Sequence, residues 1–330
     1  MNNKQEYKDF RQNEGFYFDN GYLYKIKGEE TINQLNTLVT KDIDFAEDDT
    51  CDFCFILTKN GSFYTDITYY KLEEFLIIRS SKNLAKMFIK EKINYEDISK
   101  NTTIIQVEGL QSPKLANKFY EYDIMALKFK YLVRVKDQAL ILARFGYSGE
   151  YGYQFIISNS HLQPFIQKYF NNKQMTSQEI IDYTNFEVLQ PNNAIIKSNK
   201  DYSLFDLNYG WNIDWMKMKF KGKDIAEENV LKSKVRSIGF RSINTDLKVG
   251  DKVKFNGQEI GHIILVYKSI DGIHEGVVGN AVVEKKYAAS GIQLESNSSI
   301  LKTVSAPYII PYSWSRNEDD NFSEETEGNE

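Results

Sequence analysis

Cysteine and histidine are rare in this 330-residue chain, which has 2 cysteines and 3 histidines. A secreted protein of this length usually carries more cysteines, paired as disulfides, so their scarcity favours a reducing compartment. Long apolar runs are also missing, and no window reaches the length that a membrane span requires. The first nine residues are polar without an apolar core, so we expect no signal peptide, a cytoplasmic location and no membrane partner.

The few cysteines and histidines do not form a metal-binding pattern. Cys51 and Cys54 are three residues apart in a predicted strand, where such residues point to opposite faces. His161, His262 and His274 are far from the cysteines and from one another in the sequence. Because a zinc site needs several ligands at short spacing, we expect two buried strand cysteines and no bound metal.

A basic excess is absent as well. The formal net charge is −5, and seven acidic residues lie in the last thirteen positions. The rest of the chain has 41 basic and 39 acidic side chains, without the positive surplus that is typical of a nucleic-acid-binding protein. Residues 313–330 are acidic and poor in apolar side chains, so they are predicted to form a disordered tail.

Hydrophobic patterns in the first 190 residues predict two similar α+β units. The first contains the strand 22–26, the helix 29–39, the hairpin strands 51–57 and 62–70, the strand 75–79 and the helix 83–93. The second contains the strand 103–108, the helix 113–120 and the paired strands 130–135 and 139–144, followed by helices at 162–170 and 177–189. This mixture of strands and helices indicates an α+β fold.

Short strands separated by glycine and Asn-Gly turns dominate the chain after a short helix at 225–231. They are expected at residues 236–241, 252–255, 259–267, 276–283 and 300–304, which predicts a small β-barrel or sandwich. We therefore expect an α+β core at 1–233 and a β-barrel domain at 234–312. The core is expected to have one subdomain at about 1–100 with part of 190–233, and another at 101–190.

The stretch from Arg144 to Ile157 carries the strongest candidate binding feature. Its glycines recur at positions 146, 149 and 152 between two apolar runs, which predicts two strands joined by a tight loop with a positive φ or a close backbone approach. Glu150 stands at the tip, among Tyr147, Tyr151 and Tyr153. Such a carboxylate can accept two parallel hydrogen bonds from a flat heterocycle stacked on the phenols, but the spacing alone favours a solvated hairpin tip with an ordinary surface glutamate.

The segment from Gly146 to Tyr153 resembles the Gly-Tyr-Thr-Gly-Glu-x-Gly-Tyr segment of the aminomethyltransferase (T-protein) family of the glycine cleavage system and its folate-binding relatives. Weaker matches keep the family's order over roughly residues 15–312. They are Lys27-Gly28, Asn60-Gly61, Ser203 to Trp211, Lys221 to Asp224, Val249-Gly250 and Gly257 to Gly261. The resemblance implies three domains around a central cavity for tetrahydrofolate, the last being a β-barrel, in agreement with the predicted elements.

Carried over position by position, the resemblance assigns Glu150 to the pterin ring of tetrahydrofolate, with Tyr147 beside it. Phe53 stands where the family has a pocket tyrosine, and Tyr70 is expected to share a strand face with Asp66. The expected tetrahydrofolate-binding residues are therefore Glu150, Tyr147, Phe53, Tyr70 and Trp211, which ends the Asn-Tyr-Gly-Trp match.

The chain departs from the family at the positions that matter for catalysis. The family's strand carries Asp-Asp, and its first aspartate assists transfer of the one-carbon unit; this chain has Thr65-Asp66. Asp66 is the candidate catalytic carboxylate, but a slip of one residue turns a strand side chain to the other face, so an outward strand carboxylate is an equal alternative. Ile181 replaces an arginine near Asp182, and Arg79 replaces an asparagine after the third strand.

Three possibilities remain open from the sequence. The first is transfer of a one-carbon unit between tetrahydrofolate and a small amine, ether or thioether donor. A lipoyl-bearing carrier protein is one possible partner in this transfer. The second is a non-catalytic relative that keeps the scaffold and binds folate or a partner protein. The iron-sulfur-associated branch of the family carries a cysteine signature near Lys221 to Glu227 that this chain lacks. A third alternative is another planar ligand in the same cavity.

Overall fold

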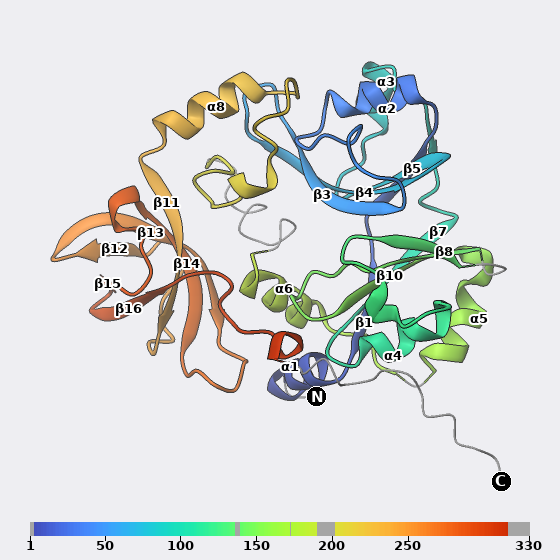
Figure 1. The fold of residues 1–330 in the computed structure, drawn as a ribbon. Coiled ribbons are helices and arrows are strands. Elements are labelled where there is room, and N and C mark those ends of the chain that lie inside the picture. The colour runs from blue at the N-terminus through green and yellow to red at the C-terminus, as the bar shows by residue number, and fades with distance from the viewer. Residues whose placement is uncertain (1–2, 136–138, 172, 190–201, 316–330) are drawn as a thin grey trace, which may run out of the picture.

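The structure is a computed structural model that describes residues 3–135, 139–171, 173–189 and 202–315. Figure 1 shows two sheets, each carrying helices, and a barrel formed by residues 235–304. The expected α+β architecture with a C-terminal β-barrel is therefore confirmed. Among the described residues, no helix combines the length and the apolar character needed to span a bilayer.

The first sheet has the strand order β3-β4-β5-β2-β6. Its elements are β2 (Tyr22–Ile26), α2 (Glu29–Asn36), β3 (Thr50–Leu57), β4 (Phe63–Leu72), β5 (Phe75–Ser80), α3 (Ala85–Lys90) and β6 (Tyr95–Asp97). The β3–β4 hairpin turns where Asn60-Gly61 predicted it, with Gly61 at a φ of 72°. One face packs under α2 and α3 through apolar side chains such as Leu35, Phe88 and Ile67.

The second sheet has the strand order β1-β7-β10-β9-β8. Its elements are β1 (Gly15–Asp19), β7 (Thr102–Glu108), α4 (Ser112–Ala116), β8 (Leu132–Val135), β9 (Leu140–Ala143), β10 (Gly152–Ser158) and α5 (Asn159–Tyr169). β1 pairs antiparallel with β7, Gly15 opposite Glu108 and Asp19 opposite Ile104. Assigning all of residues 1–100 to the first subdomain was therefore wrong, because backbone pairing places β1 in the other sheet.

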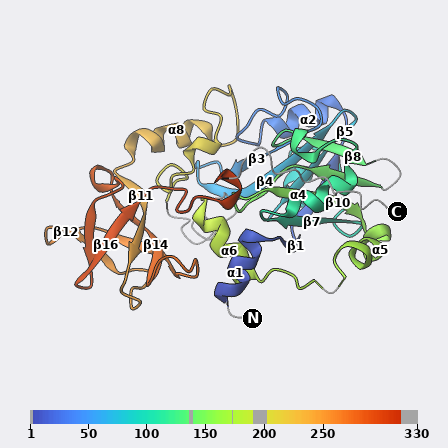
Figure 2. The same ribbon diagram turned by 60° about the horizontal axis from the view of Figure 1, so that its bottom comes forward.

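Two further helices lie between the second sheet and the barrel. They are α1 (Asn3–Gln12) and α6 (Gln178–Glu187), which lie side by side in Figures 1 and 2. The spacing of Tyr7, Phe10 and Arg11 is helical, and these are the buried side chains of α1. The expected connection over 192–215 lies in part outside the described residues. Its described part contains the short 3-10 helix η3 (Gly210–Asn212), and α8 (Lys223–Lys232) leads to the barrel.

The barrel closes in the order β11-β14-β13-β12-β15-β16. Its strands are β11 (Val235–Ser242), β12 (Lys252–Phe255), β13 (Gln258–Lys268), β14 (Val277–Glu284), β15 (Gln293–Ser296) and β16 (Ser299–Val304). Beyond β16 the chain returns to the α+β core and ends its described part in the 3-10 helix η5 (Tyr312–Ser315). The predicted tail at 313–330 was wrong at its first residues, since Ser313 is buried within η5; residues 316–330 lie outside the described part.

The largest apolar cluster joins all three units. The first sheet contributes Phe53 and Tyr70, the second contributes Tyr17 and Ile156, and the barrel region contributes Tyr308. The two sheets thus face each other across this shared core, with their helices on the outer faces. Three of the predicted binding residues, Phe53, Tyr70 and Tyr147, belong to this cluster.

Candidate functional site

A cavity of about 440 Å³ opens at the edge of the shared core. It lies where the beginning of β4 and the end of β5 meet β1 and α6. Two of the residues predicted from the sequence line it, Asp66 from β4 and Tyr147 from the glycine loop. The fold therefore brings together side chains that are 81 positions apart in the sequence, from two different sheets.

Asp66 lies on the face of β4 that is turned to the second sheet. Strand alternation puts it on the side of Thr68 and Tyr70, as expected, and its side chain is buried. Arg79 Nη1 and Ser81 Oγ both donate hydrogen bonds to Asp66 Oδ2. No hydrogen bond among the described residues uses Oδ1. The outward, solvated alternative for Asp66 is therefore wrong.

Arg79 is the cation that orients this carboxylate. Its Nε and Nη2 donate to Asp19 Oδ1 at 2.9 and 2.8 Å, while its Nη1 donates to Asp66 Oδ2. Burial alone would lower the pKa of Arg79, but Asp19 and Asp66 raise it above its ordinary value. One arginine thus connects β5 with β1 and β4, and it stands where the resemblance predicts an asparagine.

Thr65, at the position of the family's catalytic aspartate, has a different environment. Alternation places it with Ile67 and Tyr69 on the helix-covered side of β4. Its hydroxyl lies 3.2 Å from the Ser80 hydroxyl, and both are buried. Thr65 therefore belongs to the sheet interior at the margin of the cavity, and Asp66 supplies the carboxylate on the cavity side.

Three aromatic residues expected to bind a cofactor are packed against one another. The Phe53 ring lies 5.1 Å from the ring of Tyr147. The Tyr70 hydroxyl donates to Gln154 Oε1 at 2.7 Å, and Gln154 Nε2 donates to the Tyr147 hydroxyl at 3.1 Å. Burial raises the pKa of both tyrosines above the usual value, so they are neutral hydrogen-bonding groups. Tyr147 lines the cavity, whereas Phe53 and Tyr70 support it from the core.

The glycine loop owes its shape to all three glycines. Gly149 has a φ of 83°, and a Cβ on Gly152 would lie 2.4 Å from the Cα of Gly146. Both expected reasons for glycine, a positive φ and a close backbone approach, are therefore confirmed. Glu108 at the end of β7 fixes the loop, because its Oε2 accepts from the backbone N–H groups of Tyr147 and Ser148 at 2.8 and 2.7 Å.

Glu150 points away from the cavity and into a buried polar cluster. Its Oε1 accepts from the backbone N–H of Tyr312 at 3.0 Å, and its Oε2 accepts from that of Ser313 at 2.9 Å. Arg11 adds a third contact to Oε1 at 3.3 Å. The glutamate does receive two parallel N–H donors, as the sequence suggested, but they come from η5. The solvated hairpin tip is wrong, because the Glu150 side chain is fully buried.

Arg11 is the residue that the sequence reasoning missed. It is 1 % exposed and donates to the Ser148 carbonyl at 2.6 Å and to Glu187 Oε2 at 2.5 Å. Burial raises the pKa of Glu187 to about 7, although Arg11 beside it lowers that pKa. The Tyr7 hydroxyl donates to both oxygens of Glu187. The helical spacing in α1 was the only available signal for this cluster.

Gly149→Ala is expected to lower the free energy of unfolding by about 2–4 kcal/mol, measured by chemical denaturation. A positive φ costs an L-residue about 1–2 kcal/mol, and the added Cβ would lie 2.8 Å from Val188 Cγ1 and 3.2 Å from Pro311 Cγ. Gly257→Ala is the matched control, because its φ is also positive but no atom lies within 4 Å of the new Cβ. Equal losses for the two variants would contradict the tight packing of Gly149 against Pro311.

Helix α6 forms the opposite wall of the cavity with Gln178, Ile181, Asp182 and Asn185. Ile181, in place of the family's arginine, presents an apolar side chain there. The Asp182 carboxylate accepts one hydrogen bond from Gln178 at 2.9 Å. Asn185 is 4 % exposed, and its Oδ1 has no hydrogen-bond partner among the described residues. This wall therefore offers hydrogen-bond acceptors to whatever enters the cavity.

Trp211 is not part of this cavity. It lies in η3 and is 64 % exposed, in a segment that also exposes Met216 and Met218. A neighbouring tryptophan, Trp215, contacts the backbone of the same segment instead, because its indole N–H donates to the Gly210 carbonyl at 2.9 Å. The structure thus places Trp211 on the surface, apart from Asp66 and Tyr147.

The cysteines lie on opposite faces of β3, as predicted. Cys51 belongs to the core between the sheets and Cys54 to the core under α2 and α3. Burial raises the pKa of the Cys54 thiol to about 12, so it stays protonated. In the part of the chain that the structure describes, no group of three or more His, Cys, Asp or Glu residues is placed to hold a metal ion.

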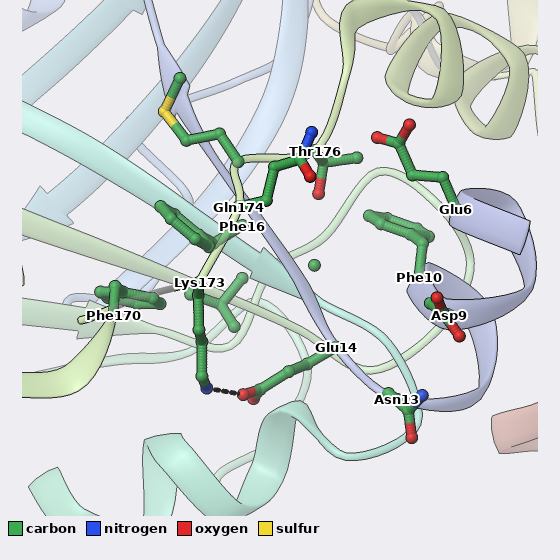
Figure 3. Close-up of a pocket in the computed structure, with 13 residues that line it drawn as sticks. Glu6, Asp9, Phe10, Asn13, Glu14, Phe16, Phe170, Lys173, Gln174 and Thr176 are labelled. Carbon is green, nitrogen blue, oxygen red and sulfur yellow. Dashed lines mark hydrogen bonds and ion pairs between the residues drawn. The ribbon is translucent and has the colours of Figure 1, made fainter. Parts of the chain in front are cut away.

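A second hollow of about 360 Å³ lies between α1, β1 and the segment after α5, and Figure 3 shows its side chains. Phe10, Phe16 and Phe170 give it an apolar lining. Its carboxylates are already engaged, since Glu14 pairs with Lys173 and Glu6 accepts from the backbone N–H of Ser177. None of the site residues predicted from the sequence lines it, so we assign the functional site to the Asp66 cavity.

Comparisons with known proteins agree with this architecture. The family described as GCVT N-terminal domain matches residues 3–217. A protein named aminomethyltransferase from Thermoanaerobacter pseudethanolicus is 25% identical over 293 residues, which cover 82% of this chain and 78% of that one. Its counterpart from Alkaliphilus metalliredigens is 25% identical over 312 residues, covering 88% and 84%. The crystal structure of glycine cleavage system aminomethyltransferase T from Bartonella henselae has a similar fold, with a TM-score of 0.79 and 15% identity over 93% of this chain and 89% of that one.

Proposed function

The chain belongs to the aminomethyltransferase (glycine cleavage T-protein)-like family as a divergent member, and on that premise we propose that it binds tetrahydrofolate and transfers a one-carbon unit to or from it. The observation that carries the proposal is the convergence of Asp66, Tyr147 and the acceptors of α6 on one cavity. A small one-carbon donor, free or on a lipoyl-bearing carrier, completes the reaction.

The cavity suits a reduced folate in size and chemistry. Its volume of about 440 Å³ lies in the range of small-molecule sites. Tyr17 and Tyr147 supply aromatic walls, and the unpaired Oδ1 of Asn185 needs an N–H donor. Phe53 and Tyr70 hold Tyr147 in position from the core. Trp211 is left out of this proposal because of its place on the surface.

Asp66 is the group that we assign to proton transfer. Arg79 and Ser81 hold Oδ2, which fixes the plane of the carboxylate and directs its chemistry to Oδ1. The folate, when bound, supplies the nitrogen atoms that carry the one-carbon unit. The protein contributes orientation of the partners and a carboxylate oxygen that accepts or returns one proton.

A second function is favoured by a specific observation. Thr65 replaces the family's aspartate and packs with Ser80 inside the sheet, while Asp66 is held by an arginine that the family lacks. A protein with these changes can keep the ligand and lose the chemistry. In that case the exposed segment with Trp211, Met216 and Met218 is a candidate contact for a partner protein.

Two measurements on the purified full chain test the proposal. Isothermal titration calorimetry with 5-formyltetrahydrofolate, a stable reduced folate, should give saturable binding with one site per chain. Incubation of tetrahydrofolate with an aminomethylated dihydrolipoyl donor should yield methylenetetrahydrofolate, together with ammonia and the free dihydrolipoyl thiol. Binding without product formation would favour the non-catalytic function, and the absence of binding would refute both folate-dependent functions.

A further inference from the structure

Resting on the proposed function, we propose that Asp182 and Asn185 of α6 bind the N–H edge of the pterin ring, the role that the resemblance gives to Glu150. A pterin presents adjacent N–H donors on its aminopyrimidine edge, and a pair of neighbouring oxygen acceptors is their complement. The inference depends on three features of the described residues: an unpaired acceptor, its neighbour on the same helix face, and the prior engagement of Glu150.

The unpaired acceptor is Asn185 Oδ1. The side chain is more than nine-tenths buried and lines the cavity, yet this oxygen has no hydrogen-bond partner among the described residues. A buried acceptor without a donor is costly in a folded protein, and such exceptions call for an explanation. A ligand N–H that enters the cavity would provide the missing donor.

Asp182 stands next to Asn185 on the same side of α6. Residues three apart on a helix are neighbours on its surface, and both line the cavity. The only hydrogen bond of the Asp182 carboxylate among the described residues comes from Gln178, on its Oδ1. The carboxylate and the amide oxygen therefore form a pair of acceptors at one wall.

The opposite wall differs from α6 because its polar side chains are already paired. Arg79 donates to Asp19 and Asp66, and Ser81 donates to Asp66. The acceptors of α6 are therefore groups of this cavity to which ligand N–H donors can add hydrogen bonds.

Glu150 cannot take this role while the C-terminal turn is in place. Both of its oxygens accept backbone N–H groups of η5, and Arg11 also contacts Oε1. Its side chain is fully buried and does not line the cavity. Glu150 already has the pair of donors that a pterin would have supplied, so the ring needs another acceptor pair.

Asn185→Leu and Asp182→Asn test the inference by calorimetry with 5-formyltetrahydrofolate. We expect each variant to bind about tenfold more weakly or worse, because each removes one acceptor of the ligand. Asn185→Asp keeps an acceptor and should stay within about threefold of the parent. Glu179→Gln is the matched control, because Glu179 is exposed on the same helix and does not line the cavity.

Stability separates ligand binding from a structural role. Asn185→Leu removes an unsatisfied buried acceptor, so its thermal midpoint without ligand should equal or exceed that of the parent. A structural asparagine would give the opposite sign. Weaker binding with unchanged or higher stability supports the inference, whereas a destabilised Asn185→Leu that binds normally overturns it.

A pair of simple ligands tests which edge is recognised. Pterin carries an amino group where lumazine carries a carbonyl, so only pterin can donate there. The parent should prefer pterin in a fluorescence titration, and Asn185→Leu and Asp182→Asn should lose that preference. If they keep it and folded Glu150→Gln loses it, Glu150 binds the ring and the inference is wrong. If the parent does not bind 5-formyltetrahydrofolate at all, the proposed function itself fails.

Discussion

Arg11→Met is expected to lower the free energy of unfolding by about 3–5 kcal/mol, because it removes one partner of a buried ion-pair cluster. Arg11 Nη2 lies 2.5 Å from Glu187 and Nη1 lies 3.3 Å from Glu150, and all three side chains are at least 98 % buried. Without the guanidinium, two carboxylates share a buried site. Methionine keeps much of the apolar stem of the arginine side chain, so the loss in free energy of unfolding reflects mainly the missing positive charge. Urea denaturation of parent and variant measures it.

The loss should grow with pH, and this identifies the ion pair as its cause. Burial raises the pKa of Glu187 from its ordinary 4.5 to about 7. Because the pKa of Glu187 is higher in the folded protein than in the unfolded chain, the protonated carboxyl stabilises the folded state. This contribution is complete below pH 4.5 and is lost as the pH rises through about 7. Removing Arg11, which lowers this pKa, extends the loss to higher pH. The difference from the parent should therefore stay constant below about pH 6 and increase as the pH rises through about 7, where Glu187 loses its proton in the parent but not in the variant.

Arg134→Met is the matched control. Arg134 pairs with Glu74 at the surface, where both side chains are about half exposed, and water and salt screen such pairs so that they contribute little to stability. A loss for Arg11→Met as small as for Arg134→Met, or one independent of pH, would mean that the Arg11 cluster does not stabilise the junction of α1, α6 and the glycine loop.

Asp66→Asn is expected to reduce turnover at least about 100-fold, if the chain transfers a one-carbon unit as proposed. Asparagine keeps an oxygen for Arg79 and Ser81, so the cavity should hold its shape, but the side chain can no longer accept the proton that we assign to Oδ1. The effect should appear in kcat, with affinity for 5-formyltetrahydrofolate within about threefold of the parent. The rate of product formation in a single turnover measures the effect on catalysis, and calorimetry measures the affinity for 5-formyltetrahydrofolate.

Asp52→Asn provides the comparison for Asp66. Asp52 lies in the adjacent strand β3, pairs with Lys41 and Lys130, and does not line the cavity. Its replacement should leave turnover unchanged. If Asp66→Asn turned over at the parent's rate, Asp66 would have no part in catalysis. If the loss lay wholly in affinity, Asp66 would be a binding group.

Local patterns were sufficient for most of the fold. The strand at 22–26 has the predicted bounds, and the Asn60-Gly61 turn joins β3 to β4 as expected, because alternation and turn chemistry are encoded within a few residues. β1 was missed because its aromatic residues are continuous rather than alternating, and β15 was missed because Leu294 is its only apolar residue. The assignment of β1 to the second sheet depends on pairing with β7, almost ninety positions away, which no local pattern contains.

The site was predictable only in part, for the same reason. The sequence identified Asp66 and Tyr147, and the fold brings them to one cavity. It could not predict where Glu150 points, because its partners lie 139 positions before it and 162 and 163 positions after it. The resemblance also could not reveal that Arg79 would orient Asp66, since the family has an asparagine there.

The meeting of two distant segments at the glycine loop has a consequence for truncated forms of the protein. Glu150 takes one donor from α1 and two from the backbone of η5. Contacts between segments so distant in sequence form late in folding. A chain shortened to end before Tyr312 would therefore leave the Glu150 carboxylate with Arg11 as its one remaining donor among these three.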